Sequence, residues 1–180
     1  MHDIANEPYN DAFGHQGRFS AITDFLLDMT EQLRKIDSRP ITIGSQSYYS
    51  ENKELCDIDV LAPHEDVITL HPYNQKNKPI EEFEKDFTKS LDYLKQFNKP
   101  IIITECCWAA PTAEARKPYL ESELAVYTKY GVGYLAQGLI TSPVADLHPV
   151  EESYLEEGLY MAFLDRDFNI RPYHDIFNNI

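Results

Sequence analysis

Short apolar segments alternate with amphipathic segments along almost the whole chain. The apolar segments, which predict strands, lie at residues 1–7, 39–44, 66–70, 99–104 and 132–136. Helical spacing of apolar residues predicts helices at 19–36, 80–94 and 118–130, a weaker one at 52–56, and a last short one after Pro172. Strict alternation of this kind is typical of parallel βα units, and 180 residues divided among five strands leave 36 for each unit. We therefore expect an α/β fold.

Two α/β architectures fit this alternation: an open doubly wound sheet, or part of an eight-stranded barrel. An open sheet would usually carry a glycine-rich phosphate turn near its first strand, and the sequence contains no Gly-x-Gly-x-x-Gly pattern. That absence favours the barrel only slightly, so both architectures stay open on the pattern alone.

Composition limits the size of the fold and the kinds of partner. A chain of 180 residues with 43% hydrophobic content can bury the core of one domain, or form a piece of one. The net charge of -14 and the pI near 4.7 argue against nucleic acid, because phosphates are bound by basic groups. No apolar run approaches the ~20 residues of a membrane span. We therefore expect no nucleic acid and no membrane as a partner.

The three cysteines do not indicate a disulfide framework or a metal site. Cys106 and Cys107 are adjacent, and Cys56 lies far from both in the sequence. This spacing matches neither a set of structural disulfides nor a zinc-ligand pattern. We expect buried or half-buried free thiols.

Polar and aromatic residues lie at the C-terminal end of each predicted strand or shortly after it. They are Asn6 and Glu7, Ser45 and Gln46, His71 and Tyr73, Glu105 and Trp108, and Gln137. Parallel α/β folds gather their chemistry at the carboxyl ends of strands, although a strand-end acid such as Glu105 can also be a plain surface charge. Two carboxylates among amides and aromatic rings are what cleavage of a glycosidic bond requires. No cluster of acids or histidines suggests a metal, so no metal and no cofactor are expected.

Three of these strand ends resemble a known family. Ile-Ala-Asn-Glu-Pro at 4–8, His-Pro-Tyr at 71–73 and Ile-Ile-Thr-Glu at 102–105 are similar to the fourth, sixth and seventh strand motifs of the glycoside hydrolase clan that includes family 5 cellulases and mannanases. The two glutamates lie 98 residues apart (105 minus 7), and the similarity runs from Met1 to about Asp167. The resemblance implies that residues 1–180 are the C-terminal part of a (β/α)8 TIM barrel, strands four to eight, with strands one to three absent.

The resemblance also implies a role for each strand-end residue. Glu7 would be the general acid/base, and Asn6 would bind the sugar 2-hydroxyl. Glu105 would be the nucleophile of a retaining mechanism, in which the two carboxyls lie ~5 to 5.5 Å apart. Tyr73 would hold Glu105 ionised and oriented, and His71 would face the substrate. The implied substrate is an oligosaccharide or polysaccharide with β-linkages, as for an endoglucanase or mannanase.

Two departures from the family pattern limit this interpretation. Gln137 stands where the clan usually has the tryptophan that forms the floor of the cleavage subsite. Trp108 is a candidate substrate-binding residue, but it could equally be a loop aromatic packed under the barrel rim. These departures leave a second hypothesis, a non-catalytic or degenerate carbohydrate-binding barrel fragment.

The start of the chain inside the fourth strand is the larger departure. The absent strands would include the arginine that the family carries early in the barrel. Exposed strand edges and apolar interior residues predict self-association, or pairing with an N-terminal half-barrel. A secreted or periplasmic location would suit the full-length family, but no signal peptide opens this chain, so localisation stays open.

Overall fold

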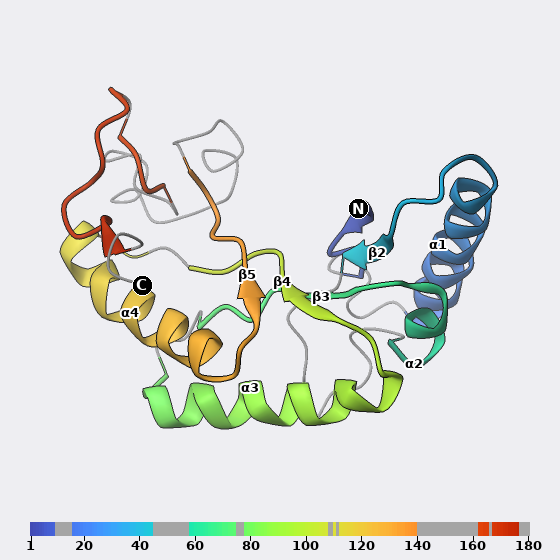
Figure 1. The fold of residues 1–180 in the computed structure, drawn as a ribbon, viewed down its shortest axis with the longest axis horizontal. Coiled ribbons are helices and arrows are strands. Elements are labelled where there is room, and N and C mark those ends of the chain that lie inside the picture. Colours follow the sequence, from blue (N-terminus) through green and yellow to red (C-terminus); the bar gives the residue numbers. More distant parts are fainter. Residues whose placement is uncertain are drawn as a thin grey trace. The chain divides into compact units, whose positions relative to one another are not determined.

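The computed structural model describes residues 1–9, 16–44, 58–74, 78–107, 110, 112–139, 162–165 and 167–176 (Figure 1). These residues fall into two compact units. Unit 1 comprises Met1–Pro72 and Glu84–Thr104, and unit 2 comprises Tyr73–Phe83 and Glu105–Ile180. The fold is mixed α/β, as the alternation predicted. Among the described residues, none of the helices combines the length and the apolar character that crossing a membrane requires.

Unit 1 is built on short strands that follow one another in sequence order. They are β1 (His2–Asn6), β2 (Ile41–Gly44), β3 (Ile68–Leu70) and β4 (Ile101–Ile103). β1 pairs in parallel with β2, and β3 pairs in parallel with β4 (Figure 1). Between the two pairs, the hydroxyls of Thr42 and Thr69 lie 2.9 Å apart, and the amide of Asp66 donates to the carbonyl of Ile41. The predicted parallel arrangement is therefore confirmed within this unit.

One long helix covers the first strand pair. α1 (Gln16–Ile36) carries Leu26 against Tyr9, Ile43 and Leu61, and these four side chains form a buried cluster. The hydroxyl of Tyr9 lies 2.8 Å from that of Thr23, so the cluster satisfies its buried phenol. The helix occupies the residues that the apolar spacing predicted.

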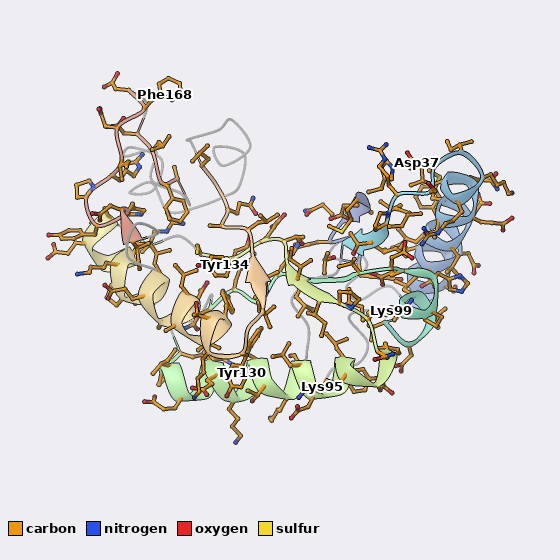
Figure 2. The ribbon with its side chains drawn as sticks, viewed as in Figure 1. Asp37, Lys95, Lys99, Tyr130, Tyr134 and Phe168 are labelled. Atoms are coloured by element: carbon orange, nitrogen blue, oxygen red, sulfur yellow. The ribbon has the colours of Figure 1, made fainter. Side chains whose placement is uncertain are left out.

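The shorter helices of unit 1 were less well predicted. α2 (Ile58–Leu61) and the 3-10 turn η3 (Ala62–His64) precede β3, and the 3-10 turn η4 (Lys95–Phe97) precedes β4. No pattern in the sequence predicted α2, and the helix predicted at 52–56 lies outside the described residues. After η4, Lys99 (Figure 2) donates a hydrogen bond to the carbonyl of Glu65.

Helix α3 (Ile80–Leu94) has the amphipathic face that the sequence predicted. Its residues Phe83, Phe87, Leu91 and Leu94 are buried, at spacings of four, four and three. Strand β4, by contrast, is less covered than its run of three isoleucines predicted. A continuous β-branched run such as residues 101–103 predicts a strand buried on both faces. Ile103 is buried, but Ile101 and Ile102 are only half-buried, so this prediction is wrong for these two residues.

Unit 2 contains α4 (Ala113–Lys129) and the two-residue strand β5 (Gly133–Tyr134). Helical spacing predicts that Leu120, Leu124 and Tyr127 face inward, and all three are buried. Gly131 ends the helix in a left-handed conformation with φ +65°. The helix nevertheless begins five residues earlier than its predicted start at Pro118. Thr112 caps it by accepting a hydrogen bond from the amide of Ala115, so Pro118 falls in the second turn.

The end of unit 2 agrees in part with the sequence. The sequence predicts a turn at 165–169. This prediction is confirmed, because the amide of Asp165 donates to the carbonyl of Asn169 and the amide of Phe168 donates to the carbonyl of Asp165. The helix predicted after Pro172 falls mostly on residues 177–180, outside the described part of the chain; residues 172 and 173 form a turn.

Candidate active site

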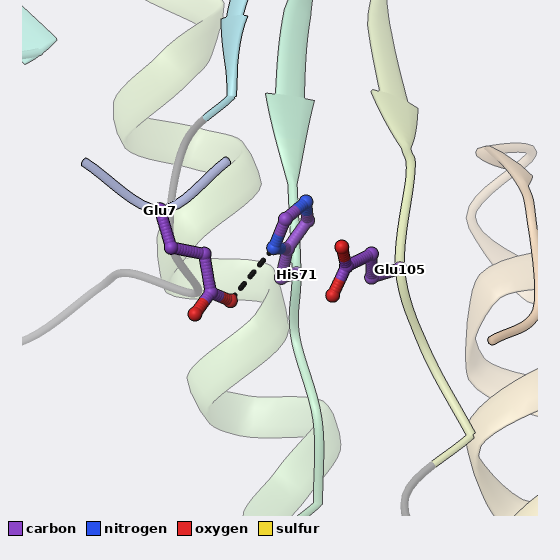
Figure 3. Close-up of side chains that lie close together, drawn as sticks. All are labelled: Glu7, His71 and Glu105. Atoms are coloured by element: carbon purple, nitrogen blue, oxygen red, sulfur yellow. Dashed lines mark hydrogen bonds and ion pairs between the residues drawn. The ribbon is translucent and has the colours of Figure 1, made fainter. Parts of the chain in front are cut away.

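In unit 1, Glu7 and His71 are joined by a hydrogen bond just beyond β1 and β3 (Figure 3). Nδ1 of His71 lies 2.7 Å from Oε1 of Glu7, and Nε2 lies 3.0 Å from Oγ1 of Thr104. A carboxylate only accepts, so the ring donates from Nδ1, and in the neutral imidazole Nε2 accepts from the Thr104 hydroxyl. With 1% of its surface exposed, His71 is held in a fixed orientation.

The backbone of Glu7 is strained. Its φ is +44°, in the left-handed region that residues other than glycine rarely adopt, and the residue precedes Pro8. Such conformations persist where surrounding contacts over-determine them, and they cluster at functional sites. Asn6, at the end of β1, is exposed beside Glu7. The local structure therefore presents an amide and a carboxylate together at one strand end.

In unit 2, Tyr73, Glu105 and Gln137 form a second hydrogen-bonded group. The phenol oxygen of Tyr73 lies 2.8 Å from Oε2 of Glu105 and 2.7 Å from Oε1 of Gln137. All three residues are half-buried. A hydrogen bond donated by the phenol fixes the direction of the Glu105 carboxylate.

The adjacent cysteines that follow Glu105 are buried free thiols, as expected. Their sulfur atoms lie 3.5 Å apart. This contact with Cys107, together with burial, raises the pKa of the Cys106 thiol well above its usual range. Because only the thiolate is nucleophilic, Cys106 is unreactive and its contribution is to packing.

The structure thus brings together the predicted residues in two sets: Glu7 with His71, and Tyr73 with Glu105 and Gln137. Trp108 lies outside the described residues. Sequence reasoning missed Thr104, which binds the far side of His71, and two buried residues of α4, Arg116 and Glu123. Thr104 could have been noticed as the residue that precedes Glu105, whereas nothing local marked the two helical residues.

The sequence of residues 1–137 matches the family model described as cellulase (glycosyl hydrolase family 5). No curated protein matches the chain. Among solved structures, the chain resembles a β-glucuronidase from Faecalibacterium prausnitzii with a TM-score of 0.70 and 15% identity, covering 98% of this chain and 30% of that one. An endo-β-1,4-mannanase from Thermotoga petrophila gives a TM-score of 0.58 and 14% identity, with coverage of 90% and 39%.

An endo-1,4-β-mannanase from Rhizomucor miehei gives a TM-score of 0.56 and 17% identity, with coverage of 99% of this chain and 53% of that one. At these identities the structural likeness concerns the fold alone. The chain spans between about a third and about half of the length of these structures.

Proposed function

The chain belongs to the cellulase family, glycosyl hydrolase family 5, and from that membership we propose that it carries the two catalytic glutamates of a retaining glycoside hydrolase. The proposed substrates are β-linked oligosaccharides or polysaccharides, cleaved as by an endoglucanase or a mannanase. The single observation that carries the proposal is the phenol of Tyr73 at 2.8 Å from the carboxylate of Glu105, beyond the end of β4.

The proposed fold is strands four to eight of a (β/α)8 barrel. Two observations support it. β1 to β4 follow one another in sequence order with parallel pairing, whereas a doubly wound sheet reverses its strand order at one point. The chain also covers only 30% to 53% of the solved glycosidases named above. The other strands of the barrel would complete the wall of the site.

In the proposed mechanism, Glu105 attacks the anomeric carbon while the bond from that carbon to the leaving oxygen breaks. Glu7 donates its proton to the leaving oxygen, and a covalent glycosyl ester forms on Glu105. Glu7, now a carboxylate, then takes a proton from water as that water attacks the anomeric carbon and releases Glu105. Tyr73 supports the first role, because its hydrogen bond fixes the direction of the Glu105 carboxylate.

Glu7 is proposed as the acid/base because it is paired with an imidazole. Nδ1–H of His71 holds Oε1 of Glu7 and so fixes the direction of the carboxyl group. His71 thus has a positioning role that its contacts support, in addition to the role toward substrate expected from the sequence. Asn6, Gln137 and Trp108 remain proposed substrate-binding residues, with Asn6 assigned to the 2-hydroxyl of the sugar.

The test replaces each glutamate by glutamine and uses two kinds of substrate. Glu105→Gln and Glu7→Gln should both lose hydrolysis of β-glucans and mannans by several orders of magnitude. On an aryl glycoside with a good leaving group, the first step needs no acid, so Glu7→Gln should still release one equivalent of phenol in a burst. Glu105→Gln should give no burst, because no ester can form.

Glu81→Gln, an exposed acid on α3, is the matched control and should behave as wild type. A burst from Glu105→Gln, or wild-type hydrolysis by either site variant, would contradict the assigned roles. Binding of a glycan without any cleavage by the wild-type enzyme would favour the second hypothesis, a non-catalytic carbohydrate-binding barrel, which the glutamine at position 137 motivates.

A further inference from the structure

Two buried charged side chains lie on one face of α4. Arg116 is 1% exposed and Glu123 is fully buried. They are seven residues apart, which is two helical turns, so they lie on the same face of the helix. Charged residues are rarely buried to this degree unless their hydrogen bonds are satisfied, so their partners indicate what they stabilise.

Glu123 holds two backbone amides from distant parts of the chain. Oε1 accepts from the amide of Asn74 at 2.9 Å, and Oε2 accepts from the amide of Cys107 at 2.9 Å and from the hydroxyl of Tyr127 at 3.3 Å. Burial raises the pKa of Glu123, and the hydrogen bonds from the two amides oppose that rise. Both oxygens of the buried carboxylate therefore accept hydrogen bonds.

Arg116 holds carbonyl groups of the same region. Its Nη2 donates to the carbonyl of Cys107 at 2.5 Å and to that of Gln137 at 3.4 Å. Its Nη1 donates to the carbonyl of Ala162 at 3.2 Å. Burial lowers the pKa of Arg116 to about 10, so the guanidinium remains charged at neutral pH.

Cys107 is therefore held at both of its backbone polar groups, its amide by Glu123 and its carbonyl by Arg116. The residue needs this support, because its φ of +74° lies in the left-handed region and its Cβ makes that conformation unfavourable. A non-glycine residue stays there only where its surroundings over-determine it. The two charged side chains supply that constraint.

The two backbone positions that these side chains hold, Asn74 and Cys107, lie next to residues of the candidate site. Cys107 lies two residues after Glu105, and Asn74 directly follows Tyr73. We propose that Glu123 and Arg116 are positioning residues that hold these two backbone segments and thereby set the direction of Glu105 and Tyr73. This inference rests on the proposed function, because that function assigns Glu105 as the nucleophile. The hydrogen bonds from Glu123 and Arg116 to the backbone of Asn74 and Cys107, which we call the backbone clamp, do not depend on that assignment.

The first test introduces Glu123→Gln into the protein form that cleaves glycans. Glutamine has the same shape, but its NH2 group must face a backbone N–H at one of the two sites and so breaks that hydrogen bond. A misplaced nucleophile should lower kcat about 100-fold, with KM changed less than about 3-fold. Glu121→Gln is the matched control on the same helix, because Glu121 is exposed and pairs only loosely with Lys117 at 3.6 Å.

The second readout is hydrogen exchange at the amides of Asn74 and Cys107, which does not depend on activity. At least one of the two should exchange about 10-fold faster or more in Glu123→Gln and remain unchanged in Glu121→Gln. Unchanged exchange at both amides, or an unchanged kcat, would overturn the inference. If the wild-type enzyme cleaves no glycan, the proposed function fails, and the exchange readout still decides whether Glu123 holds Cys107.

Arg116→Lys provides an independent variant if Glu123→Gln does not fold. Lysine keeps the charge but cannot reproduce the planar fork that binds several carbonyls at once. It should lower kcat more than it changes KM, as Glu123→Gln does. An Arg116→Lys enzyme with wild-type kcat would count against the backbone clamp.

Discussion

The phenol oxygen of Tyr73 lies 2.8 Å from Oε2 of Glu105 and, on its other side, 2.7 Å from the side-chain amide of Gln137. A phenol carries one proton, so it can donate to only one of these neighbours. Because the carboxylate is the stronger acceptor, the proton belongs toward Glu105, and Oε1 of Gln137 lies on the other side of the phenol oxygen. Gln137 thus contacts the tyrosine that orients the proposed nucleophile.

Tyr73→Phe should reduce kcat/KM. The change removes a hydrogen bond to a charged group, which is worth roughly 1.5–3 kcal/mol, so a loss of about 10- to 150-fold is expected. Steady-state kinetics on a soluble β-glucan or mannan measure it. Tyr93→Phe is the matched control, because Tyr93 also donates to a carboxylate, that of Asp59, but outside the candidate site. Equal losses in both variants would show that the effect is not specific to Glu105.

Substitutions of His71 should separate its two hydrogen bonds. In His71→Asn the side-chain NH2 can replace Nδ1–H toward Glu7, whereas in His71→Gln the longer side chain reaches toward Thr104 instead. We expect His71→Gln to lose more activity, by about 10-fold relative to His71→Asn, because it leaves Glu7 without its donor. Thr104→Val, which removes only the second bond, should cost less than either. The reverse order of the two His71 variants would mean that the Thr104 contact matters more.

The buried carboxyl of Glu65 should make the protein less stable as pH rises. Burial raises its pKa to about 7 from 4.5, so the folded state keeps a proton that the unfolded state loses between these values. Its Oε1 has no hydrogen-bond partner among the described residues, while Oε2 accepts from Thr42 and from the amide of Ile43. This rise in the pKa corresponds to a loss of about 3 kcal/mol in the free energy of unfolding between pH 4.5 and 7.

Glu65→Gln should remove that loss, because the amide keeps the acceptor for Ile43 and has no charge to bury. Urea unfolding at pH 5 and pH 8 measures the difference. The variant should gain stability relative to wild type at pH 8 and differ little at pH 5. A wild-type pH dependence in Glu65→Gln would mean that another group is responsible.

His174 should have the opposite effect on stability. Arg116 can only donate, so Nε2 of His174 accepts from it at 3.2 Å, and the proton on Nδ1 is donated to the carbonyl of Pro172 at 2.8 Å. Burial lowers the pKa of His174 below 6.5, so the unfolded state binds a proton first as the pH falls. Stability should therefore decrease below about pH 6.5.

His174→Gln is the variant that isolates this dependence, since its amide oxygen can replace Nε2 as an acceptor for Arg116. Between pH 7 and pH 5, the unfolding free energy of the wild type should fall more than that of the variant. A constant difference over this range would exclude His174 as the group that titrates.

The sequence predicted those parts of the fold that depend on local patterns. Phe83, Phe87, Leu91 and Leu94 repeat at helical spacing, so α3 was identified correctly. α4 was placed too far along the chain, because its start was predicted at Pro118, whereas the cap is Thr112. Strand-end chemistry was equally local, since Glu7 directly follows β1 and Glu105 lies two residues after β4.

The supporting contacts could not be predicted in the same way. Glu123 accepts from the amide of Asn74, 49 residues earlier in the chain, and no periodic pattern in α4 distinguishes it from the exposed Glu121. Bonds from a side chain to a distant backbone group depend on how the segments pack. Such residues therefore become visible only in three dimensions.

The contacts of Arg116 also bear on where this protein can be shortened. The family match ends at residue 137. The guanidinium of Arg116 nevertheless donates to Ala162, which is 46 residues after Arg116, and to His174, which is 58 residues after it. A protein cut at residue 137 would retain every residue of the match and both proposed catalytic glutamates, but would leave part of a buried cation without acceptors. A shortened protein must therefore keep the residues that accept hydrogen bonds from Arg116, and these residues lie after the end of the family match.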